Sequence, residues 1–76
     1  MKATPGRVRI LTALAKDGAY ARPNRSIPGE THRMTVDMEL IFRRSGYIEE
    51  ARVGLGYAWT ITQKGRDWLR AAKAEQ

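Results

Sequence analysis

The sequence contains no cysteine and only one histidine, His32. Without thiols there can be no disulfide, zinc–thiolate site, iron–sulfur ligation or cysteine nucleophile, and one imidazole cannot build a histidine cage around a metal. No apolar run approaches the ~20 residues of a membrane span, and no signal-peptide pattern opens the chain. We therefore expect no metal, no cofactor, no membrane contact and a cytoplasmic location.

What the sequence does have is a strong excess of positive charge. Fourteen lysines and arginines against eight acids give 76 residues a net charge of +6, and residues 1–30 alone carry +4. The hydrophobic content of 42% suffices for one small folded domain over residues 1–76. A basic field attracts polyanions such as nucleic acid. A merely solubilising surface is the alternative explanation.

Two helices are expected in the first half of the chain. Thr4-Pro5 is a typical helix start, and apolar residues at helical spacing predict a helix over about residues 5–16, with Gly18 as its terminator. A second helix is expected over residues 31–45, ended by a left-handed Gly46. Its predicted inner face includes Met34, Met38, Ile41 and Phe42, and its predicted outer arc holds His32, Thr35, Val36, Glu39 and Arg43.

Between these helices, residues 18–30 are rich in glycine, proline, asparagine and serine and are expected to form a loop. A strand-like Ala19-Tyr20-Ala21 and a short helical turn within residues 26–31 are both compatible with its composition.

After Gly46 the apolar spacing changes from helical to alternating. Residues 47–62 predict a β-hairpin that turns at Gly54-Leu55-Gly56. Thr62 is then a suitable cap for a last helix over about residues 63–73. We expect Phe42, Trp59 and Trp68 to pack together beneath the hairpin.

Two stretches carry a resemblance to a known family. The run from Thr35-Val36 through Arg43-Arg44-Ser45-Gly46-Tyr47-Ile48, and the run Thr60-Ile61-Thr62-Gln63-Lys64-Gly65-Arg66-Asp67-Trp68-Leu69 after a hairpin, resemble winged helix–turn–helix transcriptional regulators of prokaryotes and phages. The resemblance covers about residues 31–72 and implies an α+β winged-helix domain. The chain departs from the family because the 18–30 loop stands where a second helix is normal.

The resemblance implies that helix 31–45 reads duplex DNA and that hairpin 47–62 is the wing. Side chains of this helix and its flanks can supply donors to bases and phosphates. The wing offers only one cation near its tip and carries two acids, Glu49 and Glu50, so the helix is the favoured contact. The DNA-binding residues expected on this basis are Arg25, His32, Arg33, Thr35, Glu39, Arg43, Arg44 and Arg52.

Two functions remain open from the sequence. One is a transcriptional regulator that binds a short operator as a homodimer, because one small domain contacts too few base pairs for tight specificity. The other is a winged-helix-shaped module that binds a protein, such as a small phage-encoded inhibitor or an adaptor of a host complex. An enzyme is not expected, since no nucleophile–base pair or phosphate-binding loop is recognisable.

Overall fold

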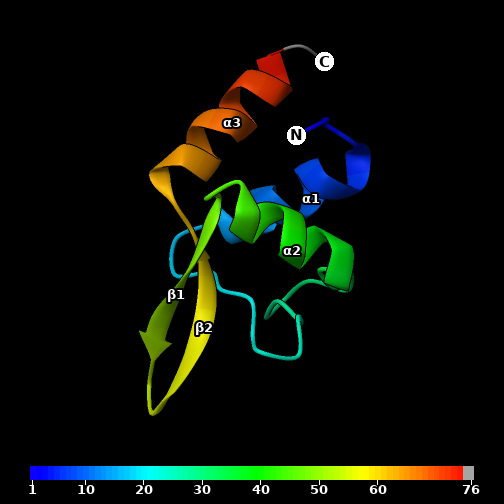
Figure 1. The fold of residues 1–76 in the computed structure, drawn as a ribbon. Coiled ribbons are helices and arrows are strands. Elements are labelled where there is room, and N and C mark those ends of the chain that lie inside the picture. Colours follow the sequence, from blue (N-terminus) through cyan, green and yellow to red (C-terminus); the bar gives the residue numbers. More distant parts are fainter. Residues whose placement is uncertain (75–76) are drawn as a thin grey trace.

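The computed structural model describes residues 1–74 and shows an α+β fold in which three helices pack at one end of an antiparallel hairpin (Figure 1). The elements are, in order, α1 (Pro5–Leu14), α2 (Val36–Arg44), β1 (Ile48–Val53), β2 (Gly56–Ile61) and α3 (Gln63–Ala74). This confirms the expected α+β class. None of the helices in these residues is long and apolar enough to span a bilayer.

Helix α1 begins where the sequence predicts. The Thr4 hydroxyl accepts a hydrogen bond from the backbone N–H of Arg7 at 3.2 Å, and Pro5 occupies the first helical position, where its missing N–H costs nothing. The helix ends at Leu14, two residues earlier than expected. The chain then turns through Gly18, whose φ is +71°.

Helix α2 is shorter than expected, and the prediction of a helix over residues 31–45 is wrong at its start. Thr35 is the N-cap, and its hydroxyl accepts the N–H of Met38 at 3.1 Å. The preceding backbone is committed elsewhere: the N–H groups of Thr31 and His32 donate to the Glu30 carboxylate, and that of Met34 donates to the Arg25 carbonyl at 3.0 Å. These bonds hold residues 31–34 outside the helix.

The end of α2 agrees with the sequence. Gly46 has a φ of +75°, and its N–H donates to the Arg43 carbonyl while that of Tyr47 donates to the Phe42 carbonyl. This is the Schellman pattern, which satisfies the last free carbonyls of a helix and reverses the chain. The reversal leads directly into β1.

The hairpin is confirmed, with a two-residue loop. Ile48 pairs with Ile61 at its base and Val53 with Gly56 at its tip, so that Gly54 and Leu55 form the turn. Gly54 has a φ of +61° and Leu55 does not have a positive φ, as in type II′ turns. Figure 1 shows this hairpin projecting away from α3.

One residue of the loop between α1 and α2 pairs with the free edge of β2 through an isolated β-bridge. Ala21 forms a bridge with Trp59, with backbone bonds of 2.9 and 2.8 Å in the two directions. The strand-like option for residues 19–21 is therefore confirmed at Ala21 alone. In residues 26–31 there is a tight turn, in which the Glu30 N–H donates to the Ile27 carbonyl at 3.0 Å, and no helix.

Helix α3 is fastened to the end of α2 by one threonine. The Thr62 hydroxyl accepts the N–H of Gly65 at 3.1 Å and donates to the carbonyl of Gly46 at 2.6 Å. Thr62 also donates its own N–H to the Tyr47 carbonyl at 2.9 Å. Gly65 lies buried against Tyr47, so the start of α3 lies close to the segment that joins α2 to β1.

The core lies between α1, α2, α3 and the base of the hairpin, and its centre is aliphatic apart from Phe42. The expectation that Phe42, Trp59 and Trp68 pack together beneath the hairpin is met in part: Phe42 is buried in the core, and both tryptophans are half-buried and pack against its edge. Trp68 stacks on Tyr47 with ring centroids 5.6 Å apart, and its indole N–H donates to the Met1 carbonyl. The large side chains that are fully buried in the core are Ile10, Leu11, Leu14, Met34 and Phe42.

Candidate nucleic-acid interface

The outer face of α2 differs from the arc that the sequence predicts. Phe42 is fully buried and sets the inward direction of the helix. Leu40, two residues away, therefore points outward with 40% of its surface exposed, whereas Glu39 is half-buried. The exposed residues of this face are Val36, Asp37, Leu40, Arg43 and Arg44. The expectation that Glu39 lies on the outer arc is thus corrected.

The loop before α2 is held in place by backbone bonds to its surroundings. Ala21 is hydrogen-bonded to β2, and a tight turn follows it. In this turn the Arg22 N–H donates to the Ser26 carbonyl at 2.8 Å, and the Arg25 N–H donates to the Arg22 carbonyl at 2.8 Å. The bond from Met34 to Arg25 then draws the two ends of the loop together. These contacts bring Arg22, Arg25 and Arg33 close to the beginning of α2.

Arg25 has an unusual backbone. Its φ is +68°, and within residues 1–74 it is the one non-glycine residue with a positive φ. This conformation costs an L-residue with a side chain of order 1 kcal/mol or more, whereas glycine adopts it freely.

Arg43 links α2 to the sheet. Its guanidinium carbon lies 4.8 Å from the centroid of the Trp59 ring, a cation–π contact that leaves the arginine itself exposed. Trp59 is the residue that pairs with Ala21, so α2, β2 and the loop meet around this indole. The contact fixes the direction in which Arg43 leaves the helix.

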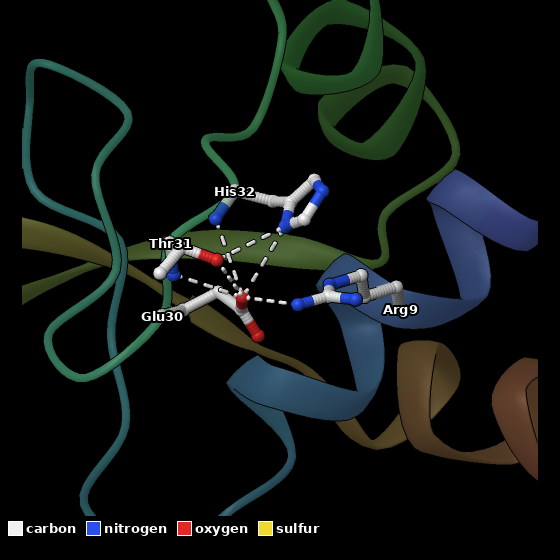
Figure 2. A network of polar contacts seen from close by, with 4 residues as sticks. All are labelled: Arg9, Glu30, Thr31 and His32. Carbon is white, nitrogen blue, oxygen red and sulfur yellow. Dashed lines mark hydrogen bonds and ion pairs between the residues drawn. The ribbon is translucent and has the colours of Figure 1, made fainter.

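A second fastening connects the loop to α1 (Figure 2). Glu30 Oε1 accepts Arg9 Nη2 at 2.8 Å and the N–H groups of Thr31 and His32 at 2.9 and 3.2 Å. These bonds favour the ionised carboxylate, and the Arg9 bond foremost lowers the pKa of Glu30 from 4.5 to about 2. The His32 ring lies 3.6 Å from the same oxygen. His32 is therefore engaged within the loop, beside α2 rather than on it.

The hairpin contributes charges of both signs. Arg52 is exposed near the tip, opposite Tyr57, while the exposed Glu49 and Glu50 lie toward the base. Glu50 is paired with Trp59, on the same face of the sheet as Arg43. The sequence prediction of a mixed wing is consistent with this distribution.

Five arginines on the loop and α2 form what we call the arginine surface: Arg22, Arg25, Arg33, Arg43 and Arg44. In the portion of the chain that the structure covers, none of the five is in a salt bridge, whereas Arg9 pairs with Glu30 and Arg70 with Asp67. The acids on α2, Asp37 and Glu39, do not neutralise it. The surface keeps a net positive charge available to an anionic partner.

The predicted site residues are therefore only partly on α2. Arg43 and Arg44 are on the helix as expected, Thr35 is its cap, and Arg25, His32 and Arg33 belong to the loop. Arg52 is on β1, toward the hairpin tip. Sequence reasoning missed Leu40 and Trp59 as parts of this face. At about 100° per residue Leu40 lies opposite Phe42, which the sequence already places on the inner face, so this spacing could have found it. Trp59 comes from β2, and no local pattern in the sequence places it beside α2.

The chain matches no protein-family model, no curated protein and no solved structure with which it was compared. Function must then be argued from the site. Within residues 1–74 no group of three or more His, Asp or Glu side chains is placed to hold a metal ion.

Proposed function

We propose that the protein binds duplex DNA through the arginine surface. The observation that carries this proposal is the gathering of five arginines, without salt-bridge partners in residues 1–74, on a loop and helix tied to one another by backbone bonds. Guanidinium groups suit phosphate and guanine recognition, and that of Arg43 is oriented by its contact with Trp59. The strained backbone of Arg25 adds support, since strain of this kind clusters at functional sites.

The proposed fold for this role is a winged helix whose second helix is replaced by the loop of residues 18–30. The order of helix, loop, helix, hairpin and helix supports it, and the bridge from Ala21 to β2 ties the loop to the hairpin. In this proposal α2 enters the major groove and the loop arginines contact the flanking phosphates.

The exposed residues of α2 determine which DNA contacts each of them can make. Val36 and Leu40 can contact thymine methyl groups, and Arg43 and Arg44 can reach guanine edges or phosphates. Thr35 caps the helix by accepting the Met38 N–H, and its hydroxyl keeps its own proton to donate to a base acceptor. We propose further that two copies bind one operator and regulate transcription, because the face of one domain covers few base pairs.

The test is duplex binding measured by fluorescence anisotropy over a range of salt concentrations, after selection of a preferred duplex from a random pool. Arg44→Ala should weaken binding and reduce the slope of log affinity against log salt by about 0.9, the value for a single neutralised phosphate. Lys73→Ala, on the exposed side of α3, is the matched control and should leave the slope nearly unchanged.

A second variant separates binding from folding. Arg25→Gly removes the guanidinium and also relieves the positive φ, so we expect stability to stay the same or rise by up to about 1 kcal/mol while duplex affinity falls. Loss of affinity with intact stability supports the proposal. Equal affinity for all variants, or no selected sequence at physiological salt, contradicts it.

One observation favours a different function. Leu40 and Val36, 40% and 50% exposed, lie at the centre of the α2 face, and apolar residues at the centre of a polar rim are also typical of protein interfaces. Under this second proposal the domain binds an acidic protein, and Leu40→Ser abolishes that binding while any duplex affinity is weak and independent of sequence.

A further inference from the structure

The tip of the hairpin carries an apolar side chain that the fold does not use. Leu55 is fully exposed, with a relative exposure of 104%, and the neighbouring Tyr57 is 48% exposed. Both residues line a shallow hollow near the tip together with Glu50 and Arg52. The core lies at the other end of the hairpin, so Leu55 contributes nothing to it.

The turn itself does not require leucine. Gly54 supplies the positive φ that the first loop position needs, and the second position of such a turn accepts small polar residues. Gly56 has no positive φ, and a Cβ added to it would meet only the Val53 carbonyl, at 4.0 Å. A side chain at position 56 would therefore fit. Because both neighbours of Leu55 are glycines, no adjacent side chain covers it.

The charges along the hairpin indicate what the tip meets. Glu49 lies toward the base, Glu50 lies at the edge of the hollow, and residues 51–57 contain Arg52 and no acid. A cation next to an uncovered apolar side chain on a narrow projection matches the minor groove of DNA, whose negative potential attracts arginine. Apolar wedges such as leucine unstack base steps there.

On this basis we propose that Leu55 inserts between two base pairs from the minor groove while Arg52 lies in the groove, so that the protein kinks its DNA. This inference rests on the proposed duplex binding and adds a second point of contact. The insertion is favoured at pyrimidine–purine steps, which unstack most easily. Tyr57, held edge-on against Trp59 with centroids 6.5 Å apart, stiffens the arm behind the tip.

The experiment uses the full chain and the selected duplex with 2-aminopurine placed at each position in turn, because the fluorescence of this base rises when it is unstacked. Wild-type protein should raise the fluorescence at one step beside the site of α2. Leu55→Ser should abolish that rise and lower the affinity about tenfold, the order expected for one disrupted base-pair interaction. Leu55→Phe should retain both, and Ala74→Ser, an exposed change on α3, serves as the control.

The outcomes separate this inference from the function on which it rests. If wild-type protein binds the duplex without raising fluorescence at any position, or if Leu55→Ser raises it equally, the wedge is refuted and duplex binding stands. If wild-type protein binds no duplex, both proposals fail together.

Discussion

Replacing Gly65 with alanine tests the junction that holds α2 to α3. A Cβ at this position would lie 2.8 Å from Ile61 Cγ1, about 0.6 Å inside the 3.4 Å limit of ordinary contact, and closer still to the Tyr47 carbonyl oxygen. The carbonyl belongs to backbone fixed by the Thr62 N–H, so neither partner is a flexible chain end. The start of α3 must then move away from Tyr47.

The expected cost is the difference of two effects. Overpacking of this kind costs about 1–3 kcal/mol, and alanine in place of glycine contributes up to about 1 kcal/mol of stability in a helix. We expect a net destabilisation of about 2 kcal/mol. A chain of this length has a free energy of unfolding of roughly 4–11 kcal/mol, and the melting temperature should fall by about 8–16 °C.

A matched control exists in α1. At Gly6 an added Cβ would meet only the mobile Cε of Met38, at 3.0 Å, so Gly6→Ala gains helix propensity and should be neutral or stabilising by up to about 1 kcal/mol. Urea unfolding followed by circular dichroism compares the two variants. An unchanged midpoint for Gly65→Ala, or an equal change for both glycines, would refute the reasoning from the junction.

Two further predictions concern the fastenings of the fold. Because the pKa of Glu30 is lowered to about 2, its bonds stabilise the fold above about pH 4.5 and are lost as the pH falls toward 2. The urea midpoint of the wild-type protein should therefore fall over this pH range, and in Glu30→Gln this fall should be smaller. An equally steep fall in the variant would contradict this. Thr62→Val removes the cap of α3 and the bond to Gly46, and should cost about 1–2 kcal/mol in the same unfolding assay. Thr62→Ser, which keeps the hydroxyl, should restore most of it, and a Ser variant as unstable as the Val variant would disprove the role of the bonds.

The features that the sequence predicts well are those fixed by neighbouring residues. Thr4 and Thr62 cap helices, and Gly46 and Gly54 turn the chain, because each needs only bonds within a few residues. The hairpin follows in the same way from alternation on both sides of a glycine turn. For these elements propensity and tertiary structure agree.

The features that the sequence predicts poorly depend on contacts between distant residues. Residues 31–34 have helical spacing, but the bond from Met34 to Arg25 and the Glu30 network commit their backbone elsewhere. The positive φ of Arg25 leaves no mark in composition or spacing, so this candidate residue could be proposed from its charge but not from its geometry.

The two tryptophans occupy such different surroundings that they can serve as separate optical probes. Trp59 lies beneath Arg43 within the arginine surface, whereas Trp68 is stacked on Tyr47 at the junction of α2 and α3. A Trp68→Phe variant would leave an emission signal that responds when Arg43 changes partner. A Trp59→Phe variant would report the opening of the helical junction, so ligand engagement and unfolding could be followed in the same molecule without an added dye.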